Sequence, residues 1–182
     1  MIYIGIDNGV TGSIGIIDEN GVAYQFATPV YKDLNYQKTK VKHITRIHFK
    51  EFRDKLMDFL YPGGNFGHSD LKIAARVAIE RPMVNPQRFD ATVSALRALE
   101  ATLIVLESLG VGKEYCDSKS WQKMFLPYIK VADKKKYPAK LKEVSLEVGK
   151  RMYPNIEWDG FKDADGILIA TWLKQKYSGV EI

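Results

Sequence analysis

The chain has 182 residues, of which 46% are hydrophobic and 27% are charged, which is enough for one α/β domain with its own core. Its net charge of +5 and pI near 9.1 favour a polyanionic partner such as nucleic acid. Because it lacks a long apolar run and a charged-then-apolar leader, we expect no membrane span, no signal peptide and a cytoplasmic location. The single Cys116 excludes an internal disulfide, and no Cys/His cluster has zinc-ligand spacing, so any bound metal would have oxygen ligands.

The first seventeen residues predict a β-hairpin. Apolar and β-branched residues in 2–6 and again in 14–17 flank the polar, glycine-containing turn 8–12. Asp7 then lies at the end of the first strand. A carboxylate in that place is costly to bury unless it is paired, hydrogen-bonded or bound to a cation. Asp7 is therefore a candidate functional residue, although an ordinary turn residue is the alternative.

The next segments predict a meander, a helix and a further strand. Residues 22–30 predict a third strand, and residues 31–46, which are polar and without a clear period, predict a loop. Apolar residues at helical spacing predict a helix over 47–60. The latter half of the apolar stretch 71–79 suits a buried strand. That strand carries Glu80 at its end, where the following proline stops it.

The chain after Glu80 is predicted to be mainly helical. Glycine, proline and serine residues divide it into segments with helical apolar spacing and one short apolar strand. The expected elements are a long helix from Asp90 or Thr92 to Gly110, a strand over 111–116, a short helix from Ser118 or Ser120 to Leu126, a helix over 139–152 and a last helix that contains the apolar run 167–173.

Acidic residues stand at the ends of three of these elements. Asp7 and Glu80 end strands, and Asp163 and Asp165 lie where the last helix should begin. Acids in a first helical turn are also favoured by the helix dipole, so the pair alone has a structural alternative. Given this order of elements, however, we expect the acids to come together in the folded chain. Divalent cations would then relieve the repulsion between the clustered carboxylates. Two such ions support phosphodiester hydrolysis.

Four motifs run through the chain in a characteristic order: Ile4-Gly-Ile-Asp-Asn-Gly-Val-Thr-Gly-Ser13, Ile79-Glu-Arg-Pro82, Lys119-Ser-Trp-Gln-Lys123 and Lys162-Asp-Ala-Asp-Gly-Ile-Leu-Ile-Ala170. Together they resemble the RuvC family of Holliday junction resolvases, especially its shorter phage-type members. The resemblance implies a single RNase H-like domain over residues 1–182, an α/β fold with a mixed five-stranded sheet flanked by helices. It also implies a homodimer that cuts four-way junctions and other branched DNA to leave 5′-phosphates. A phage-encoded protein of this kind would act in the cytoplasm of its bacterial host.

The resemblance further implies that Asp7, Glu80, Asp163 and Asp165 are the catalytic residues. They would be the ligands of two Mg²⁺ ions, with Mn²⁺ as a substitute. Members of the family usually carry their last two aspartates three residues apart, whereas here the two are separated by two positions. We expect the chain before Asp165 to be non-helical so that both acids point inward, and Asp159 is the reserve candidate.

Basic residues are expected to hold the DNA phosphates. The candidates are Arg81, Lys119, Lys123, Lys130, Lys134, Lys135 and Lys136. A solvated lysine surface that serves only solubility is the alternative. Two other functions remain open at this stage: another RNase H-like nuclease that acts on flaps or RNA, and a catalytically silent protein that only binds junctions. An actin-like ATPase, which the first motif also resembles, would need two such domains.

Overall fold

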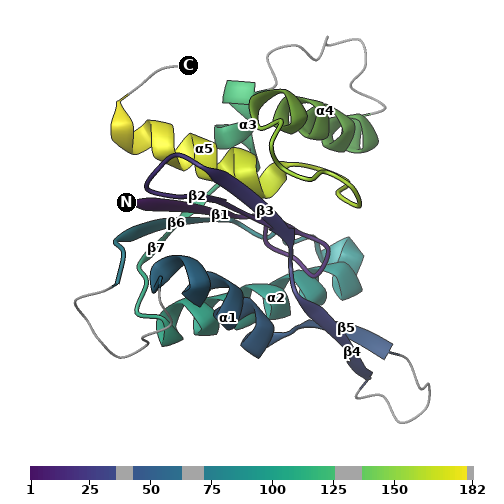
Figure 1. Ribbon diagram of the computed structural model, residues 1–182. Coiled ribbons are helices and arrows are strands. Elements are labelled where there is room, and N and C mark those ends of the chain that lie inside the picture. Colours follow the sequence, from purple (N-terminus) through teal and green to yellow (C-terminus); the bar gives the residue numbers. More distant parts are fainter. Residues whose placement is uncertain (36–42, 63–71, 126–136, 180–182) are drawn as a thin grey trace.

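The computed structural model describes residues 1–35, 43–62, 72–125 and 137–179, the side chains of 137–139 excepted. In these residues, an N-terminal group of strands is followed by alternating helices and strands and then by three consecutive helices (Figure 1). In chain order, the elements are β1 (Ile2–Ile6), β2 (Ser13–Ile17), β3 (Ala23–Ala27), β4 (Val30–Leu34), β5 (His43–Ile47), α1 (Phe49–Leu60), β6 (Ala75–Glu80), a 3-10 turn (Pro86–Arg88), α2 (Phe89–Ser108), β7 (Lys113–Cys116), α3 (Ser118–Phe125), α4 (Tyr137–Met152) and α5 (Asp165–Ser178).

A five-stranded sheet forms the centre of the fold, in the order β3-β2-β1-β6-β7. The three N-terminal strands form an antiparallel meander, and β6 and β7 extend it in parallel with β1. The predicted mixed five-stranded sheet is therefore confirmed. Because β1 and β6 are parallel neighbours, their C-terminal ends meet at one edge of the sheet.

Helices cover both faces of this sheet (Figure 1). The strands alternate, so Val77 and Ile79 of β6 pack into the core beneath α1 and α2, while Ala78 faces α3 and α5. Two apolar layers result, one on each side of the sheet. None of the described helices combines the length with the apolar character that a membrane crossing requires.

Helix α5 lies directly on the backbones of β1 and β2. A Cβ atom at Gly5 would lie 2.2 Å from the backbone nitrogen of Ala170, and one at Gly15 would lie 2.2 Å from backbone atoms of Ile167. Both distances are far inside van der Waals contact, so only glycine permits this approach. These two glycines thus set the height of α5 above the sheet.

The predicted loop over 31–46 is wrong in the described part of that range. β4 and β5 pair antiparallel from Val30 opposite Ile47 to Leu34 opposite His43, and they form a separate two-stranded sheet. Most side chains of β4 are exposed, so its sequence lacks the alternation that marks a half-buried strand. The third strand is correspondingly shorter than predicted, because β3 ends at Ala27 and the chain continues into β4.

Helix α2 begins at Phe89, slightly before the predicted starts at Asp90 or Thr92. The chain enters it through the 3-10 turn, whose first N–H group donates to the side chain of Asn85. Thr92 does not cap the helix. Its hydroxyl instead accepts from the backbone nitrogen of Asn85 and donates to the backbone oxygen of the same residue, at 3.1 and 2.9 Å.

We expect Gly5→Ala to lower the free energy of unfolding by about 3 kcal/mol or more, because the added methyl group meets backbone that cannot move aside. Gly112→Ala is the matched control, since a Cβ there has no atom within 4 Å and should be neutral or slightly stabilising. Urea unfolding of both variants measures the difference. Equal stability of the two variants would contradict the close packing of α5.

Candidate metal centre

Asp7 and Glu80 come from neighbouring parallel strands. Ile6 of β1 is paired with Ile79 of β6, so the next residue on each strand is an acid at the same edge of the sheet. Both side chains line one pocket at this edge. The indole Nε1 of Trp121 on α3 donates to Glu80 Oε2 at 3.2 Å, which anchors that carboxylate.

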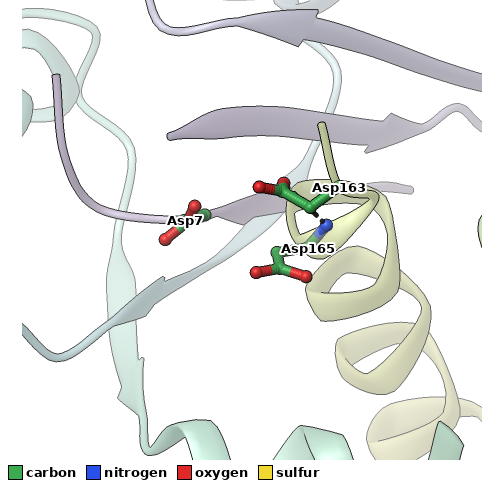
Figure 2. A group of neighbouring side chains, drawn as sticks. All are labelled: Asp7, Asp163 and Asp165. Atoms are coloured by element: carbon green, nitrogen blue, oxygen red, sulfur yellow. Dashed lines mark hydrogen bonds between the residues drawn. The ribbon is translucent and has the colours of Figure 1, made fainter. Parts of the chain in front are cut away.

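The remaining two acids come from the start of α5. Each of Asp163, Asp165 and Asp7 offers a carboxylate oxygen, and these three atoms lie within 4.8 Å of one another. Figure 2 shows Asp7 at the end of its strand beside the two acids at the beginning of the helix. α5 begins at Asp165 and Ala164 is its N-cap residue, so Asp163 lies outside the helix. Because the backbone conformation changes between them, Asp163 and Asp165 can both approach Asp7 although they are only two positions apart in the chain.

Two polar side chains from the sheet hold the first turn of α5 in place. The backbone nitrogen of Gly166 donates to Ser13 Oγ at 3.1 Å, and that of Ile167 donates to Gln25 Oε1 at 3.1 Å. The Nε2 atom of Gln25 also donates to the backbone oxygen of Asp163 at 3.0 Å. β2 and β3 therefore satisfy helix N–H groups that the helix itself leaves without partners.

Helix α4 contributes two residues that the sequence motifs did not assign to the metal centre. Lys142 Nζ forms an ion pair with Asp163 Oδ2 at 2.5 Å, and Ser145 Oγ donates to Asp165 Oδ1. Lys142 and Ser145 are three residues apart, so they share one face of α4. That spacing is a weak sequence signal, because only the packing of α4 against α5 shows which face meets the acids.

Burial and mutual repulsion raise the pKa values of the clustered acids. Burial raises the pKa of Asp7 well above the usual range for aspartate, and the neighbouring carboxylates raise it further. Burial, followed by the charge of Asp165, raises the pKa of Glu80 to about 7. Burial and the charge of Asp163 likewise raise the pKa of Asp165 to about 6. The carboxylates therefore oppose one another's ionisation, and a cation among them would favour their ionised forms.

These residues fit a hard divalent cation. Carboxylate oxygens are the ligands that Mg²⁺ and Mn²⁺ prefer, and three of them converge here from two elements. The ion pair with Lys142 shows that a positive charge is accommodated at Asp163. In the described ranges, no second group of three His, Cys, Asp or Glu side chains comes together in this way. The cluster is thus the candidate metal centre.

The other predicted site residues lie around this centre or outside the described residues. Arg81 directly follows Glu80 and is exposed, and Lys119 and Lys123 are exposed on α3. The reserve candidate, Asp159, is exposed and is not part of the aspartate cluster. Four lysines fall outside the described residues: Lys130, Lys134, Lys135 and Lys136.

In a chelator, we expect the stability of the protein to fall as the pH rises. The folded state retains protons that the unfolded chain has already released, so this stabilisation is complete below the unfolded pKa values of 3.8 and 4.5. It is lost as the pH passes about 6 for Asp165 and about 7 for Glu80. For Glu80 alone the loss is roughly 3 kcal/mol.

Urea unfolding at about pH 5 and about pH 8 tests this expectation. Glu80→Gln should flatten the pH dependence, because the amide does not titrate. Asp159→Asn is the control, since the side chain of Asp159 is exposed, and it should leave the slope unchanged. A wild-type protein that gains stability over this pH range would contradict the burial of the acids.

Comparison with known proteins adds a structural likeness. No family model and no curated protein matches the sequence. The structure of Thermus thermophilus RuvC in complex with a Holliday junction substrate matches with a TM-score of 0.53 at 15% identity, over 98% of this chain and 97% of that one. A second T. thermophilus RuvC structure matches with a TM-score of 0.54 at 14% identity, over the same shares. The chain therefore has an RNase H-like α/β fold similar to that of RuvC.

Proposed function

We propose that this protein is a metal-dependent endonuclease that resolves four-way junctions and other branched DNA, leaving 5′-phosphates. The observation that carries the proposal is the convergence of Asp7, Asp163 and Asp165, with Glu80 at the same edge of the sheet. The fold supports it, because a solved structure of similar fold is RuvC in complex with a Holliday junction substrate. The resemblance of the four sequence motifs to phage-type RuvC proteins points the same way.

In this proposal the four acids are the catalytic residues and hold two Mg²⁺ ions, for which Mn²⁺ can substitute. When bound, such ions activate a water molecule and stabilise the charge that develops on the phosphate and on the leaving 3′-oxygen. The protein supplies the positions of the ligands. Asp7 and Glu80 are fixed by paired strands, and Asp163 and Asp165 by the start of α5. Rigid elements of this kind hold a catalytic site in place without reorganisation.

Basic residues beside the acids would position the DNA backbone. Lys119 and Lys123 are four residues apart on α3, so their side chains share one exposed face, while Trp121 points from the same helix to Glu80. Arg81 lies next to Glu80 in the chain. Lys130, Lys134, Lys135 and Lys136 are proposed from the sequence alone. Such contacts orient DNA without reading its sequence.

Symmetric resolution of a junction needs two active sites, and we propose that the protein acts as a homodimer. α2 supports this, because Leu96 and Ile104 expose 44% and 49% of their surface to solvent, whereas Ala98, Val105 and Leu106 of the same helix are buried in the core. Large apolar side chains on an outer helix face are typical of protein–protein contacts. As a phage-type protein, it would act in the cytoplasm of a bacterial host.

The test is cleavage of labelled four-way junction, fork and linear duplex in Mg²⁺ by the wild type and four single variants. Asp7→Asn, Glu80→Gln, Asp163→Asn and Asp165→Asn keep the shape of each side chain and remove its charge. We expect each to lower junction cleavage by more than about 100-fold while junction binding survives. Asp159→Asn, which alters an exposed acid outside the cluster, should cleave normally.

The outcomes separate the alternatives. Paired, symmetric nicks on the four-way junction support resolution, whereas equal cutting of all substrates or preferential cutting of flaps or RNA indicates another RNase H-like nuclease. If the wild-type protein binds junctions but cleaves no substrate in Mg²⁺ or Mn²⁺, the proposed activity is refuted. The protein would then be a catalytically silent junction-binding protein.

The role of the lysines on α3 predicts a change in the salt dependence of binding. Lys119→Ala combined with Lys123→Ala should weaken junction binding and reduce the slope of log K against log salt by about 2, roughly one per lost phosphate contact. Lys50→Ala on α1, at the opposite face of the sheet, is the matched control and should leave the slope unchanged. Fluorescence anisotropy at several salt concentrations measures both. An unchanged slope in the double variant would exclude α3 from the DNA contact.

A further inference from the structure

Ser145 of α4 hydrogen-bonds the N-cap residue of α5 from the neighbouring helix. The N-cap residue of α5 is Ala164, which makes no side-chain hydrogen bond. Ser145 is only 1% exposed, and its Oγ accepts from the backbone nitrogen of Ala164 at 2.9 Å. The same hydroxyl donates to Asp165 Oδ1 at 2.5 Å. One hydroxyl thus binds two groups. These are the backbone nitrogen of Ala164, which lies between the two acids in the chain, and the carboxylate of Asp165.

This position matters because of the spacing of the acids. Two residues of a regular helix that are two positions apart do not face the same way. Here Asp163 and Asp165 meet because the backbone at Ala164 is not helical, with φ −115° and ψ 21°. Such a backbone leaves a buried N–H group at Ala164 that needs a partner, and Ser145 provides it.

The contacts of Ser145 complement those made from the sheet. Gln25 binds the backbone oxygen of Asp163 and the backbone nitrogen of Ile167 from the side of β3. Ser145 binds the intervening peptide and the carboxylate of Asp165 from the side of α4. The segment that carries both acids is therefore held from two sides, but Ser145 is the one of these two residues that touches a carboxylate of the cluster.

We propose that Ser145 is a positioning residue of the metal centre, whose hydroxyl sets Asp163 and Asp165 against Asp7 before any cation arrives. This inference rests on the proposed metal-dependent function. Hydrogen-bonding partners that orient ligand carboxylates typically change metal affinity or activity by about 10- to 100-fold when they are removed. A bridge between two helices that served packing alone would affect stability but not metal affinity.

The test measures Mn²⁺ binding without DNA, by titration followed with electron paramagnetic resonance. We expect Ser145→Ala to weaken the apparent affinity by about 10- to 100-fold relative to the wild type. Ser145→Cys is nearly the same size and a weaker donor, so it should also bind Mn²⁺ more weakly even if the alanine variant folds poorly. Circular dichroism confirms that each titrated variant is folded.

Thr171→Val is the matched control. It removes another buried hydroxyl from the same side of the sheet, where Thr171 Oγ1 bonds the backbone oxygen of Ile167 and the hydroxyl of Tyr153, away from the carboxylates. Its Mn²⁺ affinity should equal that of the wild type. Equal losses in Ser145→Ala and Thr171→Val would indicate a general effect of destabilisation and overturn the inference.

Junction cleavage at increasing Mn²⁺ provides a second readout. Ser145→Ala should recover much of its activity at saturating Mn²⁺, because the ligands are present but poorly oriented, whereas Asp165→Asn should not recover. Folded Ser145 variants with wild-type Mn²⁺ affinity would overturn the inference and leave the proposed nuclease intact. A wild type that binds no Mn²⁺ would overturn both, so the two failures are distinguishable.

Discussion

The close approach of α5 to the backbones of β1 and β2 is the constraint on which the rest of the structure depends. Side chains at Gly5 or Gly15 would collide with the backbone of α5, so the helix can lie this low only over glycine. Its first turn then reaches the end of β1, where Asp7 stands. If the helix lay one side-chain layer higher, the acids of the last motif would not meet those of the strands.

Bringing acids together in this way costs free energy, and the surrounding elements offset part of it. Burial and repulsion raise the pKa values of Asp7, Glu80 and Asp165. Trp121 donates to Glu80, Ser145 donates to Asp165, and Lys142 pairs with Asp163. The arrangement is costly as a structural feature alone, but it is what a site that binds divalent cations needs, because the same repulsion becomes attraction for the cation.

Local patterns in the sequence predicted the central sheet well and the β4–β5 pair not at all. Buried strands such as β1 and β6 are rich in isoleucine, valine and alanine, so their position and the acids at their ends follow from the order of residues. β4 is mostly exposed and is held by pairing with β5 rather than by burial, whereas Ile47 of β5 is buried in the core. A strand of that kind leaves no hydrophobic pattern to read.

The sequence by itself determined the order of the main elements and placed Asp7, Glu80, Asp163 and Asp165 at their ends, because burial and chain termination are encoded locally. Only the tertiary structure decided how Asp163 and Asp165, two positions apart in the chain, both face Asp7. That outcome depends on a non-helical Ala164 held by Ser145, and on Gln25 and Ser13 in place of a local cap. These partners are between 19 and 153 residues away in the chain. No local pattern reports such contacts, since they arise from the packing of α4 and the sheet around the start of α5.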